Sequence, residues 1–291
     1  MNIVIAGLAK NCENNFKKNI EYLIDFKEFY KESIEISILI LENDSEDNTK
    51  EIIKKFADKN YITNYCLDGL DKKLTNRIER ITYCRNFLLE KLTSFQPKKV
   101  EHCLYVSIDF DLDLFSKTPK EEFFKILNKL INQKDLTALF PNNVPYYYDV
   151  HALRKDKWNT TDSWKKYNQI SKYMPIGKFF LKYFLIYKKQ IKINTNREFI
   201  NVDSAFGGIG IYKMTKSEHS KITYESDELF EKCEHINFNS YFNCAIYTSW
   251  KVKSPKEHLE YKNLKLLNKL RYIFASFISD VKNIIFYFKK N

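Results

Sequence analysis

Short apolar runs alternate with helical patterns along the first half of the chain. Five runs have the length and β-branched content of buried strands: NIVIAGLA, EISILILEN, YITNYCL, HCLYVSIDF and LTALF. Between them, apolar residues recur at helical spacing over about 14–30, 46–58, 78–94 and 119–133. This alternation predicts an α/β fold in which parallel strands joined by helical crossovers form a doubly wound sheet. Ligands of such sheets bind at the carboxyl ends of the strands.

The second half of the chain has a different texture. From His151 to Arg197, twelve Lys or Arg accompany two Asp, and aromatic residues gather in KYMPIGKFFLKYFLIYKK. We interpret this segment as an insertion or an acceptor-side surface. Strand-like sequence returns from Phe199 to about Lys213. We therefore predict a catalytic domain over 1–261, with a donor half of about 1–115 and an acceptor half of about 116–261.

The tail over 262–291 has the pattern of a basic amphipathic helix. Apolar residues recur along one face, at Leu266, Leu267, Leu270, Ile273, Phe274, Phe277, Ile278, Val281, Ile284, Ile285 and Phe288. Seven Lys or Arg oppose one acidic residue, Asp280. Two interpretations remain open: the helix docks on an anionic membrane surface, or it packs its apolar face on the catalytic domain.

Composition limits the kinds of partner. The chain has 291 residues, 44% of them hydrophobic, and a formal net charge of +11, which suits nucleotide diphosphates, phospholipid surfaces or nucleic acid. No nucleic-acid-binding module is evident, so no nucleic acid is expected as a partner. The amino terminus has no secretory pattern, which predicts a cytoplasmic protein or one peripheral on the inner face of the cytoplasmic membrane.

The strongest chemical signal is the apolar run LYVSI followed directly by Asp109-Phe110-Asp111. Alternation along an extended chain directs both carboxylates to one side, at the carboxyl edge of the sheet. Two hard oxygen ligands there suit Mg²⁺ or Mn²⁺, which neutralises a diphosphate leaving group. Asp113 continues the alternation. An acidic turn after a strand is the plain alternative.

Two further segments supply candidate donor ligands. After the second predicted strand, we assign Asp44 to a nucleobase or ribose and Ser45 to the cap of the helix that begins near Asn48. In the helix before the DxD strand, Arg85 and its neighbouring arginines lie near the rim of the apolar face. At least one guanidinium is expected to reach a phosphate or fix a carboxylate.

The second half contributes weaker candidates. Gly207 and Gly208 lie close to Asp203, and we interpret this segment as a close approach of backbone to a sugar, with a strand irregularity as the alternative. Glu234 and His235 offer a base, a metal ligand or a sugar partner. In YYYDVHALR, the residues Tyr148, Asp149 and Arg154 are candidates for contact with the acceptor or the donor sugar.

The order of these motifs resembles GT-A glycosyltransferases. More narrowly, it is similar to the capsule-associated mannosyltransferase family of fungal capsule synthesis and its bacterial relatives, through the blocks IAGLAKNCE, ENDSEDNT, RIERITYCRN, YYYDVHALR, VDSAFGGIGIY and CEHINFN. The resemblance implies a Rossmann-like GT-A domain, a nucleotide-diphosphate sugar donor such as GDP-mannose, and a divalent metal on the DxD.

The same resemblance implies residue assignments. It puts Asp44 near the base or ribose, Arg85 near the donor and Asp111, with Asp109, on the metal. It makes Glu234 the leading acid or base and His235 a metal ligand.

The sequence thus predicts a metal-dependent transferase that moves a sugar from a nucleotide-diphosphate donor to a glycan or lipid-linked acceptor in surface polysaccharide synthesis. A non-catalytic sugar-nucleotide or glycan-binding module of the same fold is the alternative. A nucleic-acid-binding protein is a weaker one.

Overall fold

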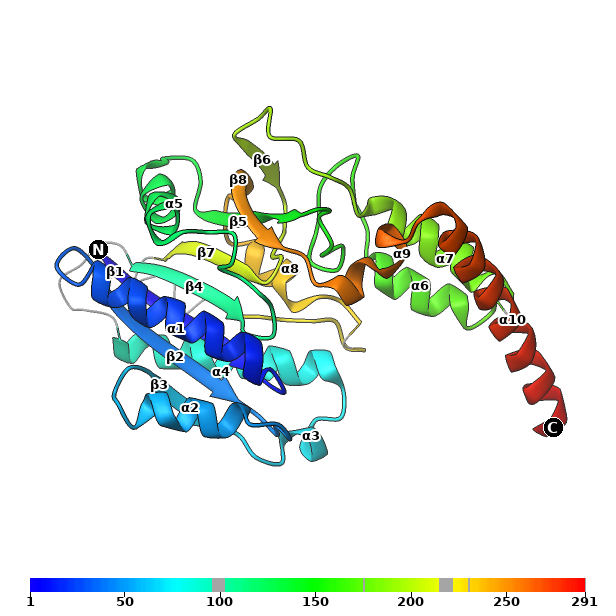
Figure 1. Ribbon diagram of the computed structural model, residues 1–291, viewed down its shortest axis with the longest axis horizontal. Coiled ribbons are helices and arrows are strands. Elements are labelled where there is room, and N and C mark those ends of the chain that lie inside the picture. The colour runs from blue at the N-terminus through cyan, green and yellow to red at the C-terminus, as the bar shows by residue number, and fades with distance from the viewer. Residues whose placement is uncertain (96–102, 175, 215–221, 230, 291) are drawn as a thin grey trace.

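The computed structural model describes residues 1–95, 103–174, 176–214, 222–229 and 231–290 (Figure 1). Eight strands and their connecting helices follow one another in this order: β1 (Asn2–Ala9), α1 (Glu13–Phe29), β2 (Glu35–Glu42), α2 (Thr49–Ala57), β3 (Thr63–Cys66), α3 (Leu70–Lys73), α4 (Arg77–Phe95), β4 (Cys103–Asp109), α5 (Lys120–Asn132), β5 (Ala138–Val144), α6 (Ser163–Ser171), α7 (Lys178–Leu185), η1 (Tyr187–Lys189), β6 (Phe199–Val202), β7 (Ile209–Met214), α8 (Glu234–Asn239), β8 (Cys244–Lys253), η2 (Lys256–Leu259), α9 (Glu260–Asn263) and α10 (Leu266–Lys290). The strands and helices predicted for the first half are present within a few residues of their expected bounds.

A single sheet contains all eight strands, in the order β3-β2-β1-β4-β7-β5-β8-β6. β3, β2, β1 and β4 are parallel and form a Rossmann-like half. The predicted α/β class is confirmed. The predicted parallel strands with helical crossovers are present in β3, β2, β1 and β4, whereas β7 lies antiparallel between β4 and β5, and β6 is an antiparallel edge strand.

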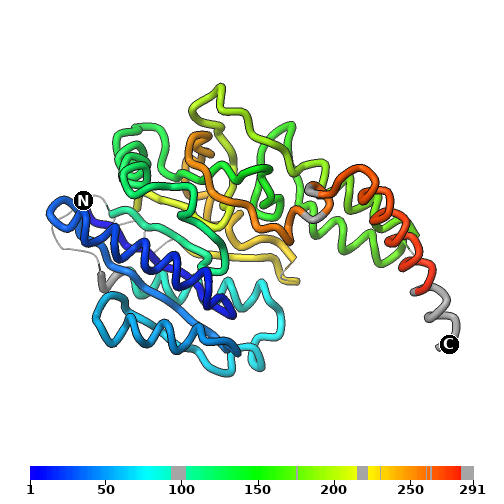
Figure 2. The backbone as a smooth tube through the Cα atoms, in the orientation of Figure 1, coloured from blue at the N-terminus to red at the C-terminus, as the bar shows by residue number. Residues whose placement is uncertain are grey.

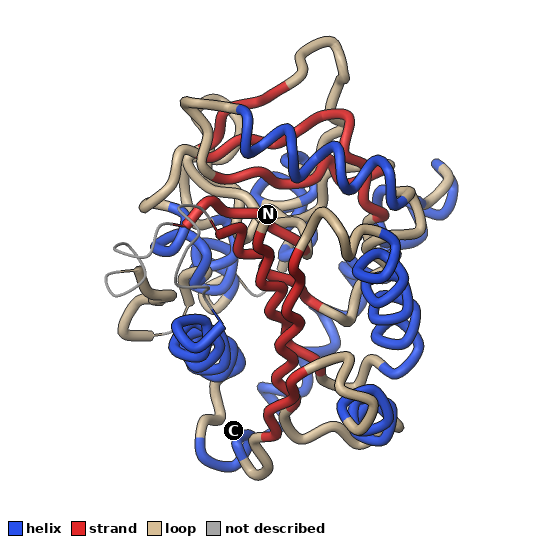
Figure 3. The backbone as a smooth tube through the Cα atoms, turned by 90° about the vertical axis from the view of Figure 1, so that its left-hand side faces the viewer, coloured by secondary structure: helices blue, strands red, loops and turns tan. Residues whose placement is uncertain are grey.

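Helices cover both faces of the sheet, which Figure 3 shows nearly edge-on. The apolar face of α1, with Phe16, Ile20 and Leu23, packs on one side together with residues of α2 and α5. On the other side α4 packs through Cys84 and Leu88, beside α8. Because β1, β2 and β4 are parallel and in register, Ala9, Glu42 and Asp109 reach the same edge of the sheet.

Phe110 links the core of the sheet to the end of β4. Its ring is fully buried, 5.0 Å from the ring of Phe16, and it lies over Gly7 of β1. A side chain on Gly7 would meet that ring, since an added Cβ lies 2.2 Å from it. Phe110 is thus anchored in the core at the start of the turn that follows β4, between Asp109 and Asp111.

A helical unit built from α6, α7, α9 and α10 projects from the sheet domain, and α10 leads away from it (Figures 1 and 2). Its apolar centre is the ring of Phe179, with Tyr261 and Tyr272 around it. The Asp280 carboxylate accepts hydrogen bonds from the backbone N–H groups of Gly177 and Lys178, at 3.0 and 3.3 Å. One face of α10 is therefore bound to α7.

The other face of α10 is open to solvent. Its large apolar side chains are exposed, namely Leu266, Leu267, Leu270, Phe274, Phe277 and Ile278. Ile284, Ile285 and Phe288, predicted on the same stripe, lie outside the residues whose side chains are described. Within the described part of the chain, no helix has both the length and the hydropathy needed to cross a bilayer.

Replacing Gly7 by Ala should lower the free energy of unfolding by about 1–3 kcal/mol, because the added methyl group overpacks the contact with Phe110. Urea unfolding measures this change. The double variant with Phe110→Leu is the control, since the smaller side chain makes room for the methyl group. Simple addition of the two single effects would show that Phe110 is not what the methyl group meets.

Candidate active site

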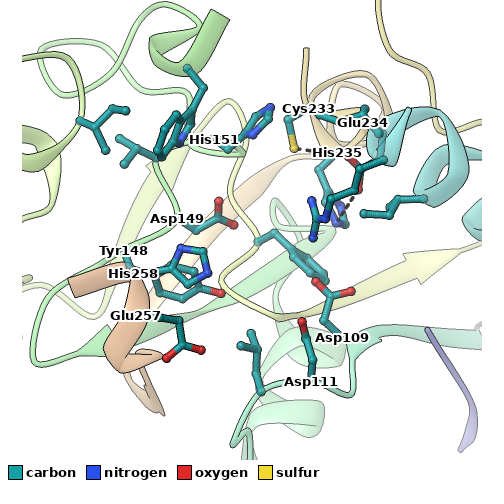
Figure 4. Close-up of a pocket in the computed structure, with 18 of the residues that line it drawn as sticks. Asp109, Asp111, Tyr148, Asp149, His151, Cys233, Glu234, His235, Glu257 and His258 are labelled. Atoms are coloured by element: carbon teal, nitrogen blue, oxygen red, sulfur yellow. Dashed lines mark hydrogen bonds and ion pairs between the residues drawn. The ribbon is translucent and has the colours of Figure 1, made fainter. Parts of the chain in front are cut away.

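The chain direction at the end of β4 is fixed by backbone contacts on both sides. The N–H of Asp109 donates to the carbonyl of Gly208 at 2.9 Å, and that of Phe110 donates to the carbonyl of Leu8 at 3.1 Å. Beyond the strand, Asn15 Nδ2 of α1 donates to the carbonyl of Asp111 at 2.6 Å. The two carboxylates therefore project from a braced turn toward the same cleft (Figure 4).

Asn19 lies one helical turn after Asn15. Its Nδ2 donates to the carbonyl oxygen of Leu112, the next residue of the turn after β4, at 2.7 Å. The sequence analysis did not identify either asparagine. Their i, i+4 spacing at the start of α1 is the signal that marks a polar strip on one face of that helix.

Two cavities meet at Asp109 and Asp111. One, of about 340 Å³, lies between the loops after β1 and β2 and the start of α4, where Lys10, Asn43 and Arg77 line it. The other, of about 280 Å³, reaches toward α8, η2 and the helical unit. Arg77 and both aspartates line both cavities, so the carboxylate pair lies at their junction.

Arg85 of α4 ties the two sides of the cleft together. It is 3% exposed, and it donates to Asp109 Oδ1 at 2.7 Å, to Glu234 Oε1 at 3.0 Å and to Ser107 Oγ at 3.1 Å. Its guanidinium carbon also lies 5.0 Å from the ring centre of Phe206. An arginine of this helix thus contacts carboxylates, through one nitrogen to each, and every side-chain nitrogen of Arg85 is engaged, while contact of Arg85 with the donor stays a prediction.

Asp111 differs electrostatically from Asp109. Burial, together with the negative charge of Asp109, raises the pKa of the Asp111 carboxyl to about 6. Asp109 has Arg85 as a partner, whereas no ion pair involves Asp111 among the described residues. Asp111 lies at the open edge of the cleft, yet the surrounding protein displaces much of its water, and a desolvated carboxylate beside a second one favours a bound cation. Asp113, by contrast, turns to Lys253, with its Oδ2 3.1 Å from the Nζ atom.

The carboxylate pair fits a divalent ion that keeps other ligands. Asp109 retains one oxygen that Arg85 does not bind, and Asp111 offers its carboxylate. Within the described chain, the group of three potential ligands whose atoms lie within 4.8 Å of one another is Glu42, Cys66 and Asp68, so His235 does not form such a group with the two aspartates. Magnesium commonly takes one or two protein carboxylates and completes its shell with phosphate and water.

Glu234 and His235 begin α8 on the far side of Arg85. The His235 ring stacks on Phe206 with centroids 3.7 Å apart, and neither ring nitrogen has a hydrogen-bond partner among the residues that the structure describes. Burial, with the nearby charge of Arg85, lowers the pKa of His235 well below its usual value, so the imidazole is neutral. Both residues line the 280 Å³ cavity (Figure 4), and their assigned chemistry stays a prediction.

The loop after β2 uses its polar residues largely for its own structure. Asp44 accepts from the backbone N–H groups of Gly69 and Asp71, at 2.5 and 2.9 Å, while Asn43 lines the 340 Å³ cavity. Burial raises the pKa of the Asp44 carboxyl, but the two backbone hydrogen bonds lower it more, so the pKa lies below its usual value. The assignment of Ser45 as a helix cap is wrong, because its Oγ accepts from Asn11 N.

Packing accounts for the glycine pair after β6. Gly207 and Gly208 have φ values of +70° and +95°, and added Cβ atoms would lie 2.3 Å from Asn143 and 2.4 Å from Leu112. The N–H of Gly207 donates to Asp149 Oδ2 at 2.9 Å. The two glycines lie in a turn before β7 and not in a strand bulge, and donor contact by these glycines stays a prediction.

The remaining candidates divide between the cleft and other surfaces. Tyr148 and Asp149 line the 280 Å³ cavity (Figure 4). Arg154 instead pairs with Asp162 at 2.8 Å, and Asp203 is exposed beside a separate surface hollow. The structure thus brings together the candidates at 85, 109, 111, 148, 149, 234 and 235, and leaves Arg154 and Asp203 outside the cleft.

Residues of η2 and the helical unit complete the wall of the larger cleft. His258 lies 5.2 Å from Tyr148 between ring centres, and Glu257, Trp164 and Lys182 also line the cavity. The sequence analysis did not identify these residues. Nothing in their local sequence distinguishes them, because only the fold brings α6, α7 and η2 to this edge.

Neither a family model nor a curated protein matches the sequence. Among solved structures, the chain is similar to TarS 1-349 of S. aureus, with 12% identity and a TM-score of 0.46 over 96% of this chain and 71% of that one. It covers 43% of a longer TarS structure.

The names of two further similar structures state which ligands those proteins bind. Glucosyl-3-phosphoglycerate synthase from Mycobacterium tuberculosis, in complex with Mn²⁺, UDP and phosphoglyceric acid, has 9% identity and a TM-score of 0.40 over 96% of this chain and 78% of that one. The mannosyltransferase PcManGT from Pyrobaculum calidifontis, in complex with GDP-Man and Mn²⁺, has 10% identity and a TM-score of 0.34 over 49% and 36%.

The names of these structures include a mannosyltransferase with GDP-Man and a synthase with UDP, and each likeness is below a TM-score of 0.5. At these TM-scores the likeness identifies no donor, metal or acceptor for this chain.

Replacing Arg85 by Met should lower the free energy of unfolding by about 3–5 kcal/mol, because the buried Glu234 and the partly buried Asp109 lose their cation. Adding Glu234→Gln to that variant should restore part of the loss, since it removes one unpaired carboxylate. Chemical denaturation provides the comparison.

Arg80→Met is the matched control, because Arg80 lies on the same helix and pairs with the half-exposed Asp71 at 3.0 Å. This change should cost less than about 1 kcal/mol. Equal losses in the two variants would contradict the ion-pair network as a source of stability.

Proposed function

We propose that this chain is a metal-dependent glycosyltransferase of the GT-A kind. The observation that carries the proposal is the pair Asp109 and Asp111 at the junction of two cavities, one basic and one rich in carboxylate and aromatic groups. The basic cavity, with Lys10 and Arg77, suits a nucleotide diphosphate. The other cavity suits the transferred sugar and the acceptor, which aromatic faces and carboxylates bind.

In the proposed reaction, the bond between the anomeric carbon and the diphosphate oxygen breaks, and a bond to an acceptor hydroxyl oxygen forms. Asp111 and Asp109 would hold a Mn²⁺ or Mg²⁺ ion, which would supply positive charge to the diphosphate leaving group. Arg77 adds a positive charge from the protein side. Glu234, oriented by Arg85, is the proposed acceptor of the hydroxyl proton, with the neutral His235 beside it.

The narrower identity of the substrates follows from the sequence resemblance. We propose a hexose donor such as GDP-mannose, and a glycan or lipid-linked acceptor of surface polysaccharide synthesis. Asn43, which lines the 340 Å³ cavity, is the proposed neighbour of the base and ribose together with Asp44, which holds the same loop through Gly69 and Asp71, and Tyr148 and Asp149 are those of the sugar.

Asp111→Ala should reduce Mn²⁺-dependent hydrolysis of nucleotide sugars at least about 100-fold, because the metal loses a ligand while the core is unaffected. A screen of nucleotide sugars in which nucleoside diphosphate release is measured provides the test. Asp109→Ala should also impair turnover, with an added loss of stability from the unpaired Arg85.

Asp113→Ala is the matched control, since this residue has the same alternation but contacts Lys253. Its activity should stay near that of the unaltered protein. Failure of the unaltered protein to hydrolyse any nucleotide sugar, while still binding one, would favour the non-catalytic module of the same fold.

The affinity of the metal-free protein for Mn²⁺ should fall as the pH is lowered through about 6. Below that pH the Asp111 carboxyl holds a proton, because its pKa is raised to about 6, and the metal must displace it. Above that pH the affinity should level off. Calorimetric titrations in buffers of different ionisation enthalpy also report the released proton. A pH-independent affinity between 5 and 7 would exclude Asp111 as the titrating ligand.

We also propose that the exposed face of α10 holds the protein peripherally on an anionic membrane. Replacing Leu270, Phe274 and Phe277 with Gln should release the protein from anionic liposomes in flotation assays, and leave donor hydrolysis intact. The face that binds α7, with Tyr272 and Asp280, is left unchanged so that the helix stays docked. The membrane interpretation fails if the unaltered protein ignores such liposomes at low salt.

A further inference from the structure

A second concavity lies next to the candidate active site, behind the α7–η1 segment. It is a groove of about 900 Å³ between that segment and the two stretches around Trp158 and Ile193. It contains six of the twelve basic residues of the 151–197 segment, namely Lys155, Lys157, Lys188, Lys189, Lys192 and Arg197. Asp156 is the one acidic residue that lines it. The basic segment noted in the sequence thus folds into a hollow and not onto a flat face.

Four of these cations are free to meet a ligand. Lys155 donates from Nζ to the carbonyl of Asn201, and Lys189 donates from Nζ to Asn159 and Ser163. The side chains of Lys157, Lys188, Lys192 and Arg197 are exposed, and none of the four forms an ion pair with an acidic group of the described chain. A hollow lined with unpaired charge of one sign concentrates a polyanion.

The groove also has apolar surface at the right depth for sugar rings. Its walls include Trp158, Ile193 and Ile200, and the indole N–H of Trp158 donates to the carbonyl of Lys189 at 2.8 Å, which fixes the ring. The Phe184 ring stands at the edge with 58% of its surface exposed. Aromatic and aliphatic faces pack on the C–H faces of sugars, while the surrounding cations meet acidic substituents.

One stretch of chain separates the groove from the candidate active site. Lys182, Ile186 and Tyr187 line the 280 Å³ cavity, whereas Phe184, Lys188 and Ile191, from the same stretch, line the groove. The partition is about one helix diameter thick, roughly 10–12 Å. A chain of several sugars is long enough to occupy the groove with one part and reach the cavity with its end.

We propose that this basic groove binds an anionic glycan, as the negatively charged stretch of the acceptor whose terminal sugar enters the active site. This inference rests on the proposed transferase function and names the chemical class of its acceptor. The inference is supported by the lining of the groove, which combines six cations, one carboxylate and an aromatic and aliphatic wall, and by its position beside the cleft.

Other anionic partners fit the groove less well. A bilayer is broad and meets projecting surfaces, such as the outer face of α10, more readily than a hollow. A single-stranded nucleic acid needs a row of exposed rings for its bases, whereas Phe184 is the one strongly exposed aromatic ring among the groove residues that the structure describes.

The test is binding of a decameric oligogalacturonate to the full chain at low ionic strength, measured calorimetrically without donor. The triple variant Lys157→Glu, Lys192→Glu and Arg197→Glu should weaken this binding at least about tenfold. A neutral maltooligosaccharide of the same length should bind far more weakly than the oligogalacturonate. The milder variant with Gln at the same three positions should show an intermediate loss, and its circular dichroism should match that of the unaltered protein.

The matched control reverses three exposed lysines on the opposite side of the sheet domain, Lys17, Lys18 and Lys125, with the same change in net charge. It should keep its oligogalacturonate affinity within about twofold. Equal losses in both triple variants would overturn the groove as the site. Absence of binding by the unaltered protein, or tighter groove-dependent binding of single-stranded DNA of equal charge, would also overturn the proposal.

Donor hydrolysis separates this inference from the function on which it rests. The groove variant should hydrolyse donor in the absence of acceptor at the unaltered rate, because none of its three residues lines the cleft. Lack of hydrolysis by the unaltered protein would count against the transferase, and the direct binding result would still decide whether the groove takes an anionic glycan.

Discussion

The cleft depends on one buried cation. Arg85 lies in the interior, where an unpaired charge is costly. Each of its three side-chain nitrogens donates a hydrogen bond, to Glu234, Ser107 and Asp109 respectively. These partners come from the end of β4 and the start of α8, which lie 125 residues apart in the chain between Asp109 and Glu234. The guanidinium therefore joins the Rossmann-like half to the carboxyl-terminal half at the point where the two cavities meet.

The two neighbouring carboxylates, Asp109 and Asp111, therefore have different electrostatic surroundings. Asp109 is committed on one side to Arg85, while Asp111 forms no ion pair among the described residues, so desolvation and the charge of Asp109 raise the pKa of Asp111. Phe110 between them belongs to the core. Backbone contacts and core packing therefore set the spacing of the two acids. Asn15 and Asn19 of α1 stabilise the turn by donating hydrogen bonds to its carbonyl groups.

The sequence predicted those parts of the structure that depend on local pattern. Apolar periodicity located the first four strands and their helices, and strand alternation predicted that Asp109 and Asp111 share a side. It did not predict β8, the antiparallel insertion of β7, or the two helices inside the basic aromatic segment, because these depend on which distant strand each one pairs with. Ser45 does not cap the helix after β2, and Arg154 and Asp203 lie outside the cleft, for a related reason. Polar residues near a motif also serve turns and surface ion pairs, and only tertiary contacts distinguish the two uses.

The open face of α10 has a consequence for how copies of the protein behave toward one another. An apolar stripe of this kind favours self-association, whereas the net positive charge of the whole chain keeps copies apart. Added salt screens the repulsion but leaves the apolar attraction intact, so colloidal stability should decline as ionic strength rises. The same salt weakens attraction to an anionic surface. Higher ionic strength should therefore promote self-association through the exposed face of α10 and weaken the binding of the same face to an anionic membrane.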